Sequence, residues 1–151
     1  SDVPTRADDV NKEGRLVPAS LQRADFYHWL MVDIPPSVHE IAAGACSDGI
    51  VPRGKQSPPG PPGTRQGLND YTAWFGGDPD MGGQYFGYDG PCPPWNDELL
   101  HHYHFALFAT DLARCPVEGP FSGQQLRAAL QGHVRAEARL TGTYSLNPKV
   151  R

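Results

Sequence analysis

The chain has 151 residues, of which 38% are hydrophobic and 20% charged, and this composition fits a single globular domain spanning residues 1–151. Its 13 basic and 17 acidic residues give a net charge of −4, and we expect no nucleic-acid partner because a general nucleic-acid binder usually carries a basic stripe. No apolar run is long enough to predict a membrane span.

The three cysteines, Cys46, Cys92 and Cys115, are an odd number and include no C-x-x-C pair. A disulfide framework is therefore not expected, and three thiols, or one pair plus a thiol, stay open. This pattern favours a reducing cytoplasm. A periplasmic or secreted location stays open as well, because the first residue is not Met, which leaves open whether a leader was removed or never included.

The first half of the chain predicts one strand between irregular segments. Residues 1–23 are polar and rich in turn formers, which predicts a long surface loop. Residues 25–34 carry strong β-formers and end at two prolines, which predicts a strand. Alternate residues of that strand form one apolar face, on which His28 is the single polar group. A lone histidine in such a place is more often a hydrogen-bonded core residue than a ligand.

Residues 37–46 are compatible with a short helix or a strand, and residues 47–84 form the least regular part. Within it, the Pro/Gly run at 58–63 predicts an exposed loop with polyproline character. The aromatic residues of 69–75 predict local order, and the glycines and the proline of 76–83 predict a turn.

The segment 85–108 joins dense turn chemistry to a strand-like run. Glycines and prolines between residues 87 and 94 exclude a helix or a central strand, and the aromatic run 101–108 predicts a strand buried on both faces. His101 and Tyr103 share one face of it, at the junction of loop and strand where ligand sites are common. From residue type alone, satisfied core polar groups are an equally good interpretation.

The C-terminal third predicts a helix followed by a strand. Ser122 and Gln125 have the spacing of a capping box, an apolar stripe follows, and Gly132 is a suitable stop. From 134 to 141 apolar and polar residues alternate strictly, which predicts a half-buried strand.

Three sequence blocks carry a resemblance. They are G-Y-D-G-P-C-P-P followed by H-H-Y-H-F, the run F-Y-H-W-L-M-V-D-I-P at 26–35, and S-D-V-P at 1–4. Together they resemble the signature of the phosphatidylethanolamine-binding protein family, also called Raf kinase inhibitor-like proteins, and most closely its bacterial subgroup. The C-terminal L-T-G-T-Y-S-L-N-P is similar to bacterial members as well, so the resemblance spans essentially the whole chain.

The resemblance implies a mainly β, antiparallel Greek-key fold with one or two short peripheral helices. It also implies an anion pocket, whose ligand residues here would be Asp2, His28, Gly90, Pro91, His101 and Tyr103, and it reverses the structural interpretation of His28. S-D-V-P matches only the end of the family's D-P-D-x-P turn. On this alignment the first Asp of that turn, and opening strands of roughly thirty residues, fall before residue 1.

We therefore expect a non-catalytic module that binds phosphate, a phosphoethanolamine headgroup or a phosphorylated ligand, without a cofactor, and that regulates a kinase or a protease. One alternative is an inhibitor that binds only a protein partner and keeps a vestigial pocket. A less favoured one is a zinc enzyme, with His102 and His104 on one strand face and a third ligand from His39 or His133. A homodimer stays open.

Overall fold

The computed structural model describes residues 2–47, 49 and 51–150, which form two compact units. Unit 1 comprises Ser1–Phe26, Pro91–Phe108 and Glu137–Arg151, and unit 2 comprises Tyr27–Gly90 and Ala109–Ala136. The single domain expected from composition stays a prediction.

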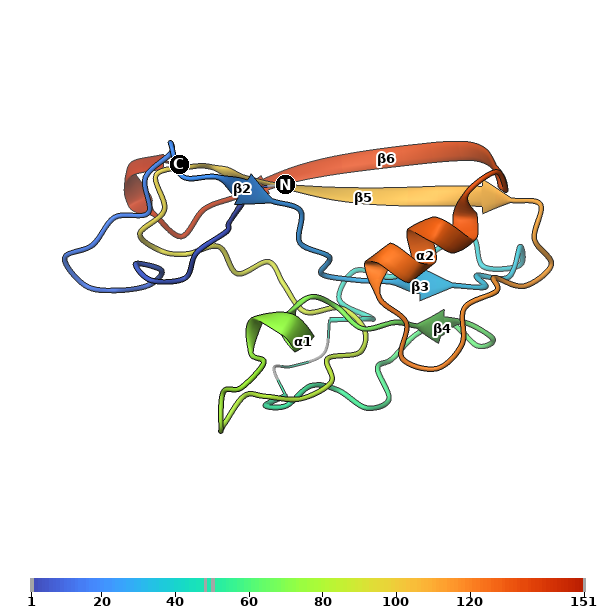
Figure 1. Ribbon diagram of the computed structural model, residues 1–151. Helices are drawn as coiled ribbons and strands as arrows, with labels where there is room; N and C mark the ends of the chain where they lie inside the picture. The colour runs from blue at the N-terminus through green and yellow to red at the C-terminus, as the bar shows by residue number, and fades with distance from the viewer. Residues whose placement is uncertain (1, 48, 50, 151) are drawn as a thin grey trace. The chain divides into compact units, whose positions relative to one another are not determined.

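Short strands and two short helices make up the regular structure (Figure 1). Strand β1 pairs with β2, β3 with β4 and β5 with β6, and the first two pairs are antiparallel. The mainly β fold with one or two short helices is confirmed. In chain order the elements are β1 (Val3–Pro4), β2 (Arg23–Ala24), β3 (Met31–Val32), β4 (Arg65–Gln66), α1 (Tyr71–Trp74), β5 (His101–Thr110), α2 (Gly123–Leu130), β6 (Val134–Tyr144) and a 3₁₀ turn at Pro148–Val150.

Unit 2 contains a hydrophobic core beneath α2, which lies beside β3 in Figure 1. Phe121, at 2% exposure, is the largest fully buried side chain, and its ring lies so close to Gly67 that a Cβ there would be 2.4 Å away. Close packing of this kind leaves no room for a larger residue at Gly67. The buried members of the core are Leu30, Val32, Cys115, Val117 and Phe121, with Tyr27, Leu126, Ala129 and Leu130 packed against them.

Helix α2 begins as the sequence predicts. Ser122 accepts a hydrogen bond from the Gln125 N–H while the Gln125 side chain accepts one from the Ser122 N–H, so the capping box is present. The helix ends at Leu130, and Gly132 follows with φ +81°. That left-handed conformation explains why glycine stands where the chain leaves the helix.

The strand predicted over residues 25–34 is wrong except at Met31–Val32. The backbone of this segment bonds to loops instead of to a neighbouring strand. Tyr27 exchanges hydrogen bonds with Asp70, through its N–H to the carboxylate and its carbonyl to the backbone N–H. The His28 carbonyl accepts from the Asp89 N–H, and Asp33 has φ +58°, a conformation that ends a strand.

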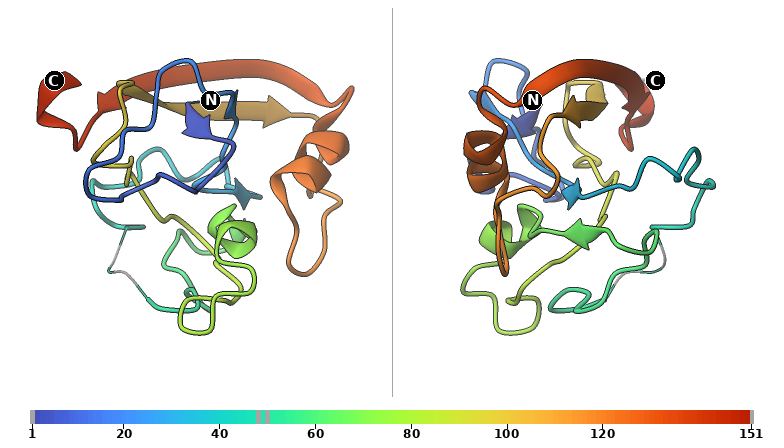
Figure 2. Two further views of the ribbon diagram at one scale, coloured as in Figure 1. Left: turned by 60° about the vertical axis from the view of Figure 1, so that its left-hand side comes forward. Right: turned by 90° about the vertical axis from the view of Figure 1, so that its right-hand side faces the viewer.

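Strands β5 and β6 lie side by side in the views of Figures 1 and 2. Both predicted strands are confirmed with longer bounds, but the predicted burial is wrong: Phe105 and Leu107 are 44% and 59% exposed, and β6 is exposed throughout. Among the described residues this sheet has two strands. Side chains on so narrow a sheet have few neighbouring side chains to bury them.

The buried interior of unit 1 is mostly polar. The predicted loop 1–23 contains β1, which pairs with β2, and beyond β1 it is irregular. Asn96, 3% exposed, holds this loop through its side-chain amide, which donates to the carbonyls of Asp9 and Arg15 and accepts from the Asn11 N–H. The loop is therefore fixed by hydrogen bonds to the segment that precedes β5.

Candidate functional site

His28 lies against the loop that carries the G-Y-D-G-P block, within unit 2. Its Nδ1 is 2.6 Å from the carbonyl oxygen of Asp89, and the Asp89 N–H donates in return to the His28 carbonyl at 3.1 Å. Because a carbonyl only accepts, Nδ1 must carry the proton, and the neutral ring then has its lone pair at Nε2. The ring also meets the Tyr71 ring edge-on at a centroid distance of 5.6 Å.

Asp89 is itself held by two buried polar side chains. Lys55, 7% exposed, donates through Nζ to Oδ1 of Asp89 at 3.1 Å and to the Tyr88 carbonyl at 2.7 Å. Asn69, 1% exposed, donates to Oδ2 of Asp89 at 2.7 Å and to the Gly87 carbonyl at 3.0 Å. These bonds compensate the burial of both polar groups and fix the carbonyl that orients His28.

Gly90 is required by the closeness of the His28 ring. A Cβ added at Gly90 would lie 2.6 Å from Nδ1 of His28, and its φ of +152° is a conformation that L residues rarely adopt. Glycine at this position therefore lets the loop backbone contact the imidazole directly. The structure thus brings together two of the predicted ligand residues, His28 and Gly90.

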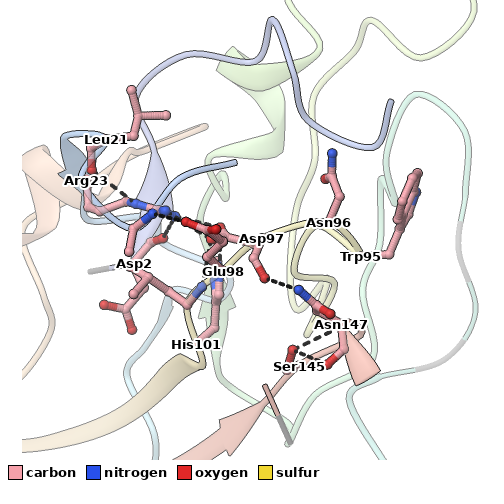
Figure 3. A network of polar contacts seen from close by, with 12 residues as sticks. Asp2, Leu21, Arg23, Trp95, Asn96, Asp97, Glu98, His101, Ser145 and Asn147 are labelled. Carbon is pink, nitrogen blue, oxygen red and sulfur yellow. Dashed lines mark hydrogen bonds and ion pairs between the residues drawn. The ribbon is translucent and has the colours of Figure 1, made fainter. Parts of the chain in front are cut away.

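In unit 1, Asp97 is 1% exposed and lies at the centre of the network of polar contacts shown in Figure 3. Its carboxylate accepts two hydrogen bonds from Arg23, at 2.5 and 2.9 Å, one from Nε2 of His101 at 2.9 Å, and one from the Leu99 N–H at 3.0 Å. The Asp97 carbonyl accepts from the Asn147 side chain at 2.7 Å. We call Arg23, Asp97, His101 and Asn147 the Asp97 network. It fixes His101, a third predicted ligand residue, at 3% exposure.

The remaining predicted ligand residues are also in unit 1. The Asp2 carboxylate accepts from the N–H and from Nδ1 of His102, at 2.8 and 3.1 Å, and only its backbone carbonyl reaches the Asp97 network, through Arg23. Pro91 is exposed and Tyr103 is half-buried. The side chain of Asp2 therefore bonds to His102 and not to His101.

The Asp97 network predicts a loss of stability in acid. Burial alone would raise the pKa of Asp97, but the hydrogen bonds from Arg23, the Leu99 N–H and His101 outweigh it and hold the pKa below its ordinary value of 3.8. A lowered folded-state pKa stabilises the protein above the ordinary value, and this contribution is lost as pH falls through the folded-state value.

Urea unfolding measures this effect. The midpoint is expected to be lower at about pH 3 than at about pH 6, with a smaller difference in Asp97→Asn. An equal pH dependence in the variant would show that Asp97 does not contribute to acid sensitivity.

The proposed zinc ligands do not form a site among the described residues, where no group of three or more His, Cys, Asp or Glu side chains is arranged to hold a metal. The rings of His102 and His104 are stacked at 6.4 Å, and Nδ1 of His104 bonds to the Thr141 hydroxyl. His39 and His133 belong to unit 2, where His133 pairs with Asp111.

Two further expectations concern thiols and membranes. All three cysteines are free: Cys46 and Cys115 are buried, and Cys92 is exposed. Burial raises the pKa of the Cys115 thiol, with the nearby Asp33 adding to the effect, so this thiol is less readily ionised than usual. In the part of the chain that the structure describes, no helix is long and apolar enough to cross a membrane.

Sequence reasoning missed the residues that hold the histidines. Asp89 stands within a block that carried the resemblance, and Asp97 stands in the spacer that follows this block, but no spacing rule links them to Arg23, Lys55 or Asn69. Those partners are 74, 34 and 20 residues distant in the chain. The one available signal was the dense polar run from residue 96 to 98, directly before the predicted strand.

Comparison with known proteins identifies the family. The sequence profile described as phosphatidylethanolamine-binding protein matches residues 1–145. A UPF0098 protein of Pyrococcus horikoshii is 34% identical over 79% of this chain and 49% of its own length, and one of Chlamydia muridarum is 31% identical over 95% and 77%. The chain thus spans about half the length of the Pyrococcus relative.

A solved structure agrees with this result. The crystal structure of Escherichia coli YbcL, titled a new member of the mammalian PEBP family, has 29% sequence identity to this chain and a TM-score of 0.58, over 80% of this chain and 61% of YbcL. Fold and sequence therefore agree: the chain belongs to the phosphatidylethanolamine-binding protein family, in its bacterial and archaeal UPF0098 subgroup.

Proposed function

We propose that this chain is a non-catalytic binding module for a small anion that carries a phosphate group, such as phosphate itself or a phosphoethanolamine headgroup. The observation that carries the proposal is the arrangement around His28. Its ring is oriented by the Asp89 carbonyl and contacted by the backbone of Gly90, and Asp89 is held by Lys55 and Asn69. Such preorganisation lowers the entropic cost of binding a ligand.

The chemistry of these groups suits a phosphate. With Nδ1 of His28 bonded to a carbonyl, a protonated ring directs its second N–H along a fixed line, and a charge-assisted hydrogen bond to a phosphate oxygen is stronger than a neutral one. Membership of a family described as phosphatidylethanolamine-binding supports the same ligand class. His101 is the second histidine that we assign to anion binding.

Finer roles follow from the resemblance and stay predictions. They are regulation of a kinase or a protease, self-association, and Asp2, Pro91 and Tyr103 as ligand residues. A cytoplasmic location, predicted from the cysteine pattern, also stays a prediction. The free cysteines fit a reducing compartment. The competing hypothesis is an inhibitor that contacts only a protein partner and no longer binds an anion.

Calorimetric titration tests the proposal. Phosphoethanolamine and inorganic phosphate, titrated separately, are each expected to bind the unmodified chain with a dissociation constant of about a millimolar or lower. His28→Ala is expected to weaken binding by about tenfold to a hundredfold, because it removes one charge-assisted hydrogen bond. His39→Ala, which removes an exposed histidine of the same unit, is the matched control.

The two ligands separate two sources of the same chemistry. Tighter binding of phosphoethanolamine than of phosphate would indicate a lipid headgroup, and equal binding a site for the phosphate group alone. No saturable heat with either ligand, or equal affinities in His28→Ala and the unmodified chain, would contradict the proposal and favour the inhibitor without an anion site.

A further inference from the structure

The Asp97 network determines which nitrogen of His101 carries a proton. Nε2 lies 2.9 Å from Oδ2 of Asp97, and an ionised carboxylate can only accept. The pKa of Asp97 is held below its ordinary value, so this carboxylate is ionised at neutral pH. Nε2 of His101 is therefore the protonated nitrogen, and in the neutral ring Nδ1 has the lone pair.

Nδ1 of His101 makes no hydrogen bond within the described residues, although the residue is only 3% exposed. Among those residues, no side-chain nitrogen or oxygen is both sealed from solvent and without a hydrogen-bond partner. Nδ1 is consequently not sealed from solvent, although the residue as a whole is buried. A buried residue with one open polar atom is suited to a ligand, since ordering the ring costs nothing further on binding.

Arg23 gives the network its charge. All five of its N–H donors are used, two by the Asp97 carboxylate and three by the carbonyls of Asp2, Pro18 and Leu21. The Arg23–Asp97 pair has no net charge, so a protonated His101 beside it leaves one unit of positive charge. Without Arg23, the positive charge of a protonated His101 would only offset the negative charge of Asp97.

We propose that Asp97, paired with Arg23, is the positioning residue that holds a protonated His101 ring so that its Nδ1–H donates to a phosphate oxygen. This inference rests on the proposed anion binding. It assigns the ligand-facing atom of His101 and explains why an arginine that is distant in the sequence lies beside it with a side chain only 11% exposed.

The Asp97→Asn variant distinguishes positioning from packing. An amide placed with its oxygen at the Oδ1 position points its NH₂ group at one Arg23 donor and at Nε2 of His101. The opposite placement points it at another Arg23 donor and at the Leu99 N–H. In the first placement, moving the His101 proton from Nε2 to Nδ1 removes the conflict between the amide NH₂ and Nε2, and only the conflict with Arg23 is left. The variant is therefore expected to favour the tautomer that is protonated at Nδ1.

Long-range nitrogen–proton NMR spectra of the imidazole rings measure the tautomer without any ligand. The neutral His101 ring of the unmodified chain is expected to be protonated at Nε2, and that of Asp97→Asn mainly at Nδ1. The neutral amide of Asp97→Asn leaves the charge of Arg23 uncompensated, which disfavours protonation of His101, so Nδ1–H then donates from a neutral ring. Calorimetry with inorganic phosphate is therefore expected to show binding weakened by about tenfold in the variant, because the charge-assisted hydrogen bond is replaced by a neutral one. Asp111→Asn, which changes the exposed partner of His133, is the control and is expected to leave both readouts at His101 unchanged.

The outcomes separate the inference from the proposed function. A neutral His101 ring that carries its proton at Nδ1 in the unmodified, ligand-free chain overturns the inference, and no variant is needed to detect it. Unchanged phosphate affinity in a folded Asp97→Asn variant with an altered tautomer overturns it as well. No phosphate binding by the unmodified chain overturns the proposed function, whatever the tautomer of His101.

Discussion

Replacing Asp97 with alanine is expected to lower the free energy of unfolding by about 3–5 kcal/mol, because removing one partner of a buried ion pair leaves the other charge uncompensated. The partner is Arg23, whose side chain is 11% exposed and therefore cannot regain full hydration in place. His101 and the Leu99 N–H lose their acceptor in the same change. Urea denaturation measures the difference.

Asp111→Ala is the matched control. Asp111 also pairs with a histidine and an arginine, His133 and Arg135, but its side chain is 38% exposed and that of Arg135 60%. Exposed pairs of this kind contribute much less than buried ones, because water screens their charges. Equal losses in the two variants would show that burial of the Asp97 network does not determine its contribution to stability.

Replacing Gly90 with alanine is expected to destabilise unit 2 by about 1–3 kcal/mol and to weaken anion binding. The new Cβ would lie 2.6 Å from Nδ1 of His28, and the backbone φ of +152° is strained for alanine. Relief of the contact requires the His28 ring to leave the Asp89 carbonyl, which breaks the bond that orients it. Thermal unfolding and phosphate calorimetry measure the two effects.

A double variant separates the steric term from the backbone term. In a His28→Ala background the clash is absent, so Gly90→Ala should cost less there than in the unmodified chain. Gly142→Ala is the control, because the space around that glycine within 4 Å is open. If Gly90→Ala and Gly142→Ala had equal effects, the close contact between Gly90 and His28 would be refuted.

Local rules predicted the elements whose ends are set by neighbouring residues. The capping box at Ser122 and the glycine after α2 act within a few residues, and the alternation over β6 is likewise local. The strand over residues 25–34 was predicted wrongly because its backbone groups bond to Asp70 and Asp89, distant partners that no local pattern encodes.

The site shows the same division. Sequence motifs predicted His28, Gly90 and His101 as ligand residues, and the structure places the His28 ring against Gly90. The groups that orient the histidines were not predicted, because their partners are distant in the chain and because an aspartate in a loop is most often solvated. The prediction that β5 is buried was also wrong. An apolar run shows that a strand is suited to burial, but it does not show whether another part of the chain covers that strand.

His28 in unit 2 and His101 in unit 1, each oriented by its own hydrogen bonds, are both proposed to contact phosphate. The chain has six histidines, so NMR spectra of their rings during a titration with inorganic phosphate contain their own controls. The His28 and His101 signals are expected to move along saturating curves, while those of His39 and His133 stay unchanged. Signals of His28 and His101 that remain unchanged, at phosphate concentrations that shift only the exposed rings, would contradict the proposed binding.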